Sequence, residues 1–175
     1  CQSYAFTPLS LNDLRLFGTT SGTSDELALR WSRGSIGTYQ TLDPAALRTQ
    51  REVILNFVET AILSGQEEFR ELLSVAKEVA GTKQDFGAHL EMIGVVLTDL
   101  LYLKEGRSDN VINVDIQLRL EKLGQNVSLE NLIRLTEFLR LMENSLKTHV
   151  NRPMLTEVLA LSSNAITSSV PASRI

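Results

Sequence analysis

Residues 128–146 read SLENLIRLTEFLRLMENSL, and this stretch decides the class of fold. Ser128 suits the N-cap of a helix, because its hydroxyl accepts a hydrogen bond from a free backbone N–H of the first turn. Apolar side chains then recur every three or four residues, the spacing of one helix face. They are Leu129, Leu132, Ile133, Leu135, Phe138, Leu139, Met142 and Leu146. Charged side chains from Glu130 to Lys147 occupy the opposite side, so the stretch predicts an amphipathic helix.

The same signals recur towards the N-terminus of this helix. Asp43-Pro44 is an N-cap followed by proline at the first helical position. Glycines at positions 65, 81 and 106 interrupt the apolar spacing that follows. We therefore expect helices at about 44–63, 69–80 and 85–104, a short helix within 111–126, and a last one at about 154–161.

Three short helices are expected before residue 43. Ser10 and Ser24 are the predicted N-caps of the first two, and Leu11, Leu14 and Leu16 supply the apolar face of the first. Gly34 is expected to end the second helix in a left-handed cap, before a third helix at about 35–42.

The predicted fold is therefore all-α, a small three-helix module followed by a five- to six-helix bundle. We expect the module in residues 1–43 and the bundle in residues 44–161. Residues 162–175 are rich in serine, and we expect this tail to be disordered.

Composition excludes several classes of function. The net charge of −4 and pI near 5.3 disfavour a free-standing nucleic-acid binder, which usually carries a basic surface. The single cysteine, Cys1, permits no internal disulfide, which fits a reducing cytoplasm. The longest apolar run, Met92 to Leu103, is interrupted by Thr98 and Asp99, so no membrane span is expected. We also expect the chain to be part of a longer protein.

No catalytic or metal-binding pattern is legible in the sequence. His89 and His149 have no ligand partners at metal spacing, and we interpret both as surface or packing residues. The charged run Gln66-Glu67-Glu68 is interpreted as a solvated helix face, and Cys1 lacks a helper base. No catalytic residue, metal or cofactor is therefore predicted for this chain.

The one glycine-rich stretch is Arg33-Gly34-Ser35-Ile36-Gly37. On spacing alone it is a helix C-cap and a turn into the next helix. Helix N-termini also favour anions, so a phosphate contact stays open from the residues alone.

Two stretches of the sequence carry a family resemblance. The first begins at Cys1-Gln2 and Phe6-Thr7-Pro8-Leu9 and continues as residues 28–37, ALRWSRGSIG. The second has the landmarks Asp99-Leu100-Leu101, Asn113-Val114-Asp115, Ser128-Leu129-Glu130 and Val150-Asn151-Arg152. Together they resemble a known family, the bacterial clamp-loader subunits, and within it the delta-prime subunit of DNA polymerase III. The first stretch resembles the junction between the AAA+ core and the three-helix lid of these subunits, and the second resembles their C-terminal collar domain.

The resemblance implies the end of an AAA+ core and a lid in residues 1–43, and an oligomerising collar in residues 44–161. In the ATP-hydrolysing members of the family, a lid arginine senses the nucleotide after the Gly-Ser of this motif. Here the motif reads Gly34, Ser35 and then Gly37 at the sensor position. Glycine cannot supply a charge to phosphate. Arg33 precedes the motif, and we do not assign it the sensor role.

The implied protein is a non-catalytic structural subunit, cytoplasmic, in the complex that loads the sliding clamp during DNA replication. Its partners would be the other clamp-loader subunits, with clamp and DNA reached indirectly through the complex. Although this family belongs to a nucleotidyltransferase holoenzyme, residues 1–175 carry no recognisable active site. Two alternatives remain, an ATP-hydrolysing gamma/tau subunit and an unrelated helical adaptor.

Overall fold

The computed structural model describes residues 7–20, 24–63, 69–81 and 83–145, together with residues 154, 156–158, 160 and 162. The regular structure of this described part is helical throughout, which confirms the predicted all-α fold. The described residues 154, 156–158 and 160 are helical, as expected for the last helix at about 154–161, but Ser162, which we expected in the disordered tail, is helical as well. Residues 1–6, Gly65, His149 and the predicted tail from residue 163 onwards lie outside the described residues.

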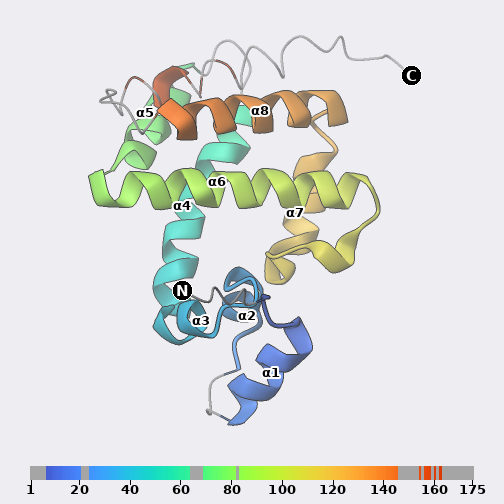
Figure 1. Ribbon diagram of the computed structural model, residues 1–175. Helices are drawn as coiled ribbons and strands as arrows, with labels where there is room; N and C mark the ends of the chain where they lie inside the picture. Colours follow the sequence, from blue (N-terminus) through green and yellow to red (C-terminus); the bar gives the residue numbers. More distant parts are fainter. Residues whose placement is uncertain are drawn as a thin grey trace, which may run out of the picture.

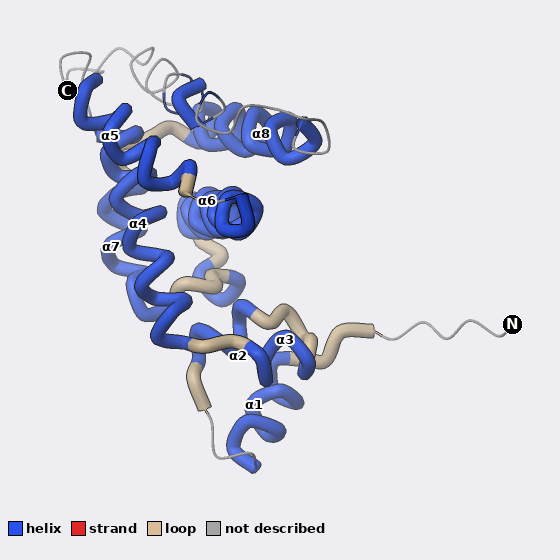
Figure 2. Tube along the Cα trace, turned by 90° about the vertical axis from the view of Figure 1, so that its left-hand side faces the viewer, coloured by secondary structure: helices blue, strands red, loops and turns tan. Residues whose placement is uncertain are grey.

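The longer helices form two crossing layers. Figure 2 shows α6 and α8 stacked end-on beside a layer made by α4, α5 and α7, with α1 to α3 below. In Figure 1, α6 and α8 run in opposite directions across the molecule. The helices are α1 (Leu11–Thr20), α2 (Glu26–Trp31), α3 (Ile36–Thr41), α4 (Pro44–Leu63), α5 (Phe69–Ala80), α6 (Lys83–Lys104), α7 (Gln117–Gly124) and α8 (Leu129–Ser145). Two 3-10 turns, η2 (Ser108–Asn110) and η3 (Val114–Ile116), lie between α6 and α7.

Helix α6 is the central element of the bundle. Its side chains Leu90, Ile93, Val96 and Leu100 are at most 1% exposed and belong to the main core with residues of α4, α5, α7 and α8. Its stretch Phe86–Lys104 is long and apolar enough to cross a membrane, although the sequence predicted no span there. More than half of that stretch, 56%, is buried inside the protein, as in the core helix of a water-soluble bundle.

The first three helices enclose a small core of their own. Leu14, Ala28, Leu29 and Tyr39 are its buried residues, and Phe17 packs edge-on against Tyr39 with ring centroids 6.5 Å apart. Helix α2 also contributes to the main core through Leu27 and the half-buried Trp31. The two cores therefore meet along α2.

Most predicted helix starts are confirmed. The hydroxyl oxygens of Ser10 and Ser128 accept hydrogen bonds from the backbone N–H groups of Asp13 and Asn131. The predicted cap at Ser24 was wrong by one residue. The N-cap is Asp25, whose carboxylate accepts from Ala28 N at 3.0 Å.

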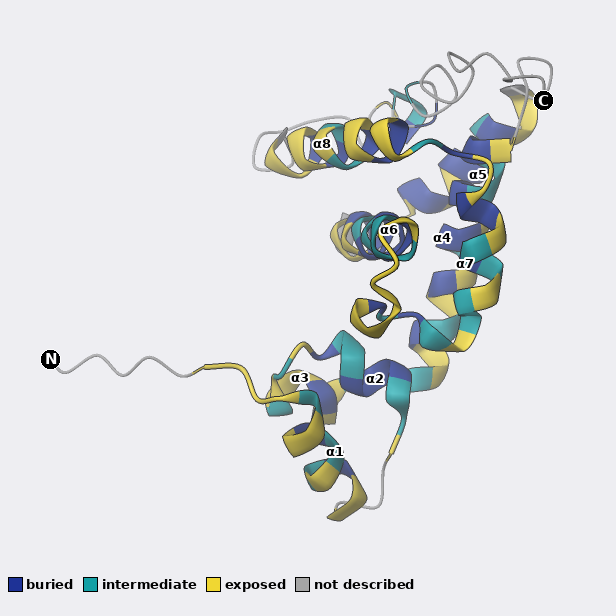
Figure 3. Ribbon diagram, turned by 90° about the vertical axis from the view of Figure 1, so that its right-hand side faces the viewer, coloured by how far each residue is buried: buried dark blue, intermediate teal, exposed yellow. Residues whose placement is uncertain are grey.

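Some predicted apolar faces were too wide. Leu16 is 71% exposed, and on α8 Leu129 and Ile133 are 41% and 45% exposed. Figure 3 shows the exposed outer side of α8. These side chains of α8 stay in water because the helix packs mainly on α6, which covers a narrower arc than the apolar spacing spans.

Two aliphatic residues of α8 test this assignment of faces. Leu135 is 2% exposed, and Leu135→Ala is expected to lower the free energy of unfolding by about 2–5 kcal/mol, because a cavity replaces buried methyl groups. Ile133→Ala, the matched control on the exposed side, is expected to change it by less than about 1 kcal/mol. Urea denaturation followed by far-UV circular dichroism measures both. Equal losses would contradict the packing of α8 described here.

Candidate functional site

Gly34 lies in the turn between α2 and α3 and packs against residues 8 and 9, which precede α1. Its carbonyl oxygen accepts a hydrogen bond from Leu9 N at 3.0 Å, and its φ of +88° confirms the predicted left-handed conformation. A Cβ at this position would lie 2.6 Å from both Leu9 O and Pro8 Cβ, too close for any side chain. Glycine is therefore required here by both conformation and space.

Ser35 and Gly37 have different roles in the next turn. Ser35 is the N-cap of α3, and its hydroxyl oxygen accepts from Thr38 N at 3.2 Å and from Thr38 Oγ1 at 2.9 Å. Gly37 is exposed, and a Cβ there would meet no atom within 4 Å. Position 37 therefore has room for a Cβ, but glycine supplies no charge. Whether these residues would face a nucleotide stays a prediction.

A network of polar side chains joins the first three helices to the bundle, and we call it the junction. Its members are Asp25, Glu26, Arg30, Arg48, Arg51, Asp99, Asn113 and Asp115. Arg30 of α2 donates through Nη1 to the carbonyl oxygens of Asp109 and Val111, at 2.9 and 2.7 Å. Its Nε donates to Glu26 Oε1 at 2.8 Å. One guanidinium therefore fixes α2 to a segment about eighty residues further along the chain.

Helix α4 contributes two further arginines. Arg51 is 3% exposed and donates from Nη1 and Nη2 to the two carboxylate oxygens of Asp115, at 2.7 and 2.6 Å. Nη1 also donates to Asn113 Oδ1 at 3.2 Å. Arg48 Nη2 bonds Asp25 Oδ2 at 2.6 Å, and its Nε lies 3.9 Å from Asp115 Oδ2. Arg48 thus connects the N-cap of α2 to the carboxylate that neutralises Arg51.

Asp99 of α6 anchors the segment that carries these partners. Its side chain is fully buried and accepts from Ile112 N at 2.9 Å, Asn113 N at 2.9 Å and Asn113 Nδ2 at 2.7 Å. Burial raises the pKa of Asp99, and the three hydrogen bonds offset this only in part. The carboxylate acts as a cap for backbone groups that would otherwise be buried without partners.

The pKa values of the other junction carboxylates, Asp115, Glu26 and Asp25, are lowered. The hydrogen bonds from Arg51 lower the pKa of Asp115, and those from Arg15 and Arg30 lower the pKa of Glu26, in each case against a smaller effect of burial. For Asp25, burial raises the pKa, but the bonds from Arg48 and Ala28 N outweigh it and leave the pKa below its usual range. These carboxylates are therefore charged at neutral pH and hold the junction by ion pairs.

The landmarks Asp99, Asn113 and Asp115, known from the sequence only by their order, come together at the junction. The arginines that join them, Arg30, Arg48 and Arg51, were not singled out from the sequence. Arg30 and Arg51 bond partners 62 to 81 residues away in sequence, so no local pattern marks them. One signal was available, because Asp99 interrupts an apolar helix, and a charge there requires buried partners.

The chemistry available at the junction is structural. Its carboxylates are engaged by arginines or backbone N–H groups, and its members include no nucleophile paired with a base. His89, in contrast, is buried in α6 with its Nδ1 2.7 Å from Val79 O, which confirms a packing role. Among the described residues, no group of three or more His, Cys, Asp or Glu residues could hold a metal ion. The arrangement holds α2, α4, α6 and the segment after α6 together.

Comparison with known families gives a match over the bundle. The family model described as DNA polymerase III, delta subunit, C terminal, matches residues 48–163, which is most of the chain. The matched region begins inside α4 and includes Arg51, Asp99 and Asn113. No curated protein and no solved structure matches the chain.

A pair of glycine substitutions tests the turn. Gly34→Ala is expected to lower the free energy of unfolding by about 2 kcal/mol or more, because the methyl group meets Leu9 O and the backbone is left-handed. Gly37→Ala is expected to raise it by up to about 1 kcal/mol, since alanine is the better helix former and the space is open. Thermal unfolding of the two variants beside the parent chain measures the difference. Similar Tm values for the two variants would contradict the turn geometry.

The pH dependence of stability tests the ion pairs. The lowered pKa of Asp115 means that its contribution is fully present above about pH 4 and is lost as pH falls through the folded-state pKa. Asp115→Asn is therefore expected to cost about 2 kcal/mol at pH 7, where Arg51 loses its charged partner, and progressively less below pH 4. The raised pKa of Asp99 acts in the opposite sense, and the comparison of variant with parent removes it.

Trp31, the only tryptophan, reports on the contact of α2 with the bundle through its fluorescence. Asp109→Asn changes the same group at an exposed position of the same segment and serves as the control. If the difference in the free energy of unfolding between Asp115→Asn and the parent stays constant from pH 7 to pH 3, the Arg51–Asp115 pair is not the source of the pH-dependent stability.

Proposed function

Since the chain belongs to the family formed by the C-terminal domains of DNA polymerase III delta subunits, we propose that it is a non-catalytic structural part of the clamp loader. The complex that contains it would load the sliding clamp onto DNA during replication. The observation that carries this proposal is the family match over the helical bundle, residues 48–163. The junction supports it, because its groups suit mechanical coupling and offer no catalytic pairing.

Within the family we propose the delta-prime type. The ordered landmarks at residues 99–115 and 128–132 support this assignment. Position 37 supports it as well, because the sensor arginine of the ATP-hydrolysing members is replaced by an exposed glycine with open space around it. This chargeless position fits a protein that does not itself hydrolyse ATP.

We propose that residues 1–43 are the end of an AAA+ core and its lid, and residues 44–161 the collar that contacts other clamp-loader subunits. The separate small core of α1, α2 and α3 supports the division. The junction crosses it, because Arg30 bonds the segment at 109–111 and Arg48 bonds Asp25. The lid would therefore follow the collar closely, and movement of the AAA+ core would be passed through α2 into the bundle.

The partners follow from this role. The bundle would contact other clamp-loader subunits in the cytoplasm, and the sliding clamp and DNA would be reached through the assembled complex. The acidic net charge of −4 agrees with indirect rather than direct DNA contact. No cofactor is proposed for residues 1–175.

Reconstitution of the clamp loader tests the proposal. The full-length protein that contains this chain is expected to co-elute with the remaining clamp-loader subunits and to support ATP-dependent clamp loading, while hydrolysing no ATP alone. Arg30→Gln, combined with Arg48→Gln, is expected to leave assembly intact and to reduce clamp loading, because it removes the polar links of α2 to the bundle and leaves only its apolar contacts.

Arg134→Gln is the control, since this exposed arginine pairs with Glu130 on its own helix, α8. ATP hydrolysis by the full-length protein alone would favour the gamma/tau alternative. Failure to join any clamp-loader subunit would favour an unrelated adaptor.

A further inference from the structure

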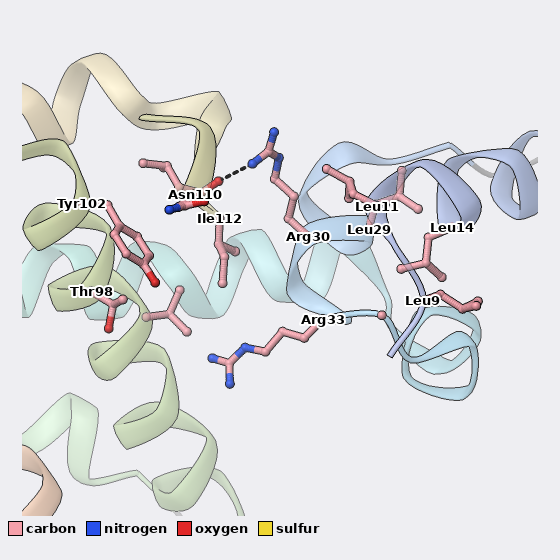
Figure 4. A pocket seen from close by; sticks show the side chains of 13 residues that line it. Leu9, Leu11, Leu14, Leu29, Arg30, Arg33, Thr98, Tyr102, Asn110 and Ile112 are labelled. Carbon is pink, nitrogen blue, oxygen red and sulfur yellow. Dashed lines mark hydrogen bonds between the residues drawn. The ribbon is translucent and has the colours of Figure 1, made fainter. Parts of the chain in front are cut away.

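A groove of about 520 Å³ separates the first helices from α6 and the segment that follows it. Figure 4 shows its walls, with Leu11, Leu14 and Leu29 on one side and Thr98, Tyr102 and Ile112 on the other. Its accessible apolar surface comes from Leu9, which is 39% exposed, and from the half-buried Leu11, Tyr102 and Ile112, whereas Leu14 and Leu29 are 1% exposed and lie beneath it. The groove is therefore mostly aliphatic and open to solvent along its rim.

The charged residues among those described around this groove are positive. Arg30 and Arg33 line it, and no carboxylate is among its described lining residues, in a chain whose net charge is −4. Arg30 is held by the junction through Nη1 and Nε. Arg33 points into the space between the walls (Figure 4), and its pairing with Glu91 is long, at 3.9 Å, with both side chains 59% exposed. Such an exposed pair is weak in water, so Arg33 is available to a ligand.

The backbone at Arg33 is a second and independent observation. Its φ is +47°, a left-handed conformation that costs free energy for a residue with a Cβ and that glycine or asparagine adopts more readily. Arg33 directly follows Ser32, the C-cap of α2, where helices commonly place a left-handed glycine, so the turn requires this conformation and an arginine adopts it at a cost. Strain of this kind is found where a side chain is needed for function.

The hollow continues beyond the groove. A second depression shares Arg33, Val95 and Thr98 with it and runs over α6, past Glu91, to Arg140 and Glu143 of α8. Arg33 therefore lies in the middle of an elongated trough, apolar at one end and of mixed charge at the other. This shape suits an extended chain better than a compact small molecule.

We propose that this trough binds an extended peptide segment of another protein that carries aliphatic side chains and a carboxylate. The aliphatic side chains would pack on Leu9, Leu11 and Ile112, and Arg33 would pair with the carboxylate. The aliphatic walls disfavour a nucleic-acid backbone, which needs several cations and offers no apolar group of this kind. The proposal stands on the groove itself and does not depend on the clamp-loader assignment.

The test uses the 175-residue chain and a phage-displayed library of random heptapeptides. Peptides selected by the chain are expected to combine aliphatic residues with aspartate or glutamate. Fluorescein-labelled copies of the selected peptides, and versions with the acid changed to its amide, are then titrated with the chain by fluorescence anisotropy. We expect the amide versions to bind about fivefold more weakly or worse.

Three variants locate the site. Arg33→Gln is expected to weaken the binding of the acidic peptides by about fivefold and to leave the binding of the amide versions unchanged. Arg134→Gln, at an exposed arginine of α8, is the control and is expected to change neither affinity. Arg33→Gly is expected to lose the same affinity while its Tm stays equal or rises by about 2–4 °C, because the left-handed strain is relieved. A residue kept only for the fold would lower the Tm when removed.

Several outcomes would overturn the proposal. These are the absence of any enriched peptide, enrichment of basic peptides, and affinity for the acidic peptides that is equal in the parent chain and in Arg33→Gln. Binding of a labelled duplex DNA that is lost with Arg33→Gln would assign the trough to nucleic acid instead. None of these outcomes bears on whether the full-length protein joins the clamp loader.

Discussion

The pairing of the buried guanidinium of Arg51 with Asp115 is the interaction on which the arrangement of the two parts depends. A charge that is 3% exposed is tolerated only when it is neutralised and hydrogen-bonded, so Asp115 and Asn113 must be delivered to α4. Asp99 makes this possible, because it fixes the backbone of residues 112 and 113 against α6. The packing of α4 on α6 and the path of the segment after α6 therefore depend on each other. The first three helices are connected to both through Arg48 and Arg30.

This arrangement gives the molecule a stiff connection where two small cores meet. Leu27 and Trp31 of α2 enter the main core, while Ala28 and Leu29 of the same helix enter the smaller one. A helix of six residues is too short to be stable alone, so α2 takes its position from both neighbours. Displacing it would break apolar contacts and ion pairs together.

The sequence predicted the helices well because residues within a few positions of each helix end determine its boundary. Asp43-Pro44, Ser128 and Gly34 each act through their own or adjacent backbone, and the structure confirms all three. Burial was predicted less well, since Leu16 and Ile133 have the spacing of a core face but meet no covering element among the described residues. The junction was not predicted as a site, because its partners are separated by tens of residues and only the fold brings them together. The groove at Arg33 could not be predicted either, because its lining residues come from distant parts of the sequence, although the glycine-rich turn beside it was recognised.

The burial of α6 on several sides also has a consequence for how the chain is made. During synthesis, residues 83–104 leave the ribosomal exit tunnel before α7 and α8 do, so the helix that is long and apolar enough for a membrane span is exposed to water before α7 and α8 can pack on it. During that interval α4 and α5 can shield it only in part, and its remaining apolar surface is open to other nascent chains. A chaperone that acts during translation would therefore bind mainly this segment. The segment would no longer need protection once α8 has emerged and packed on it.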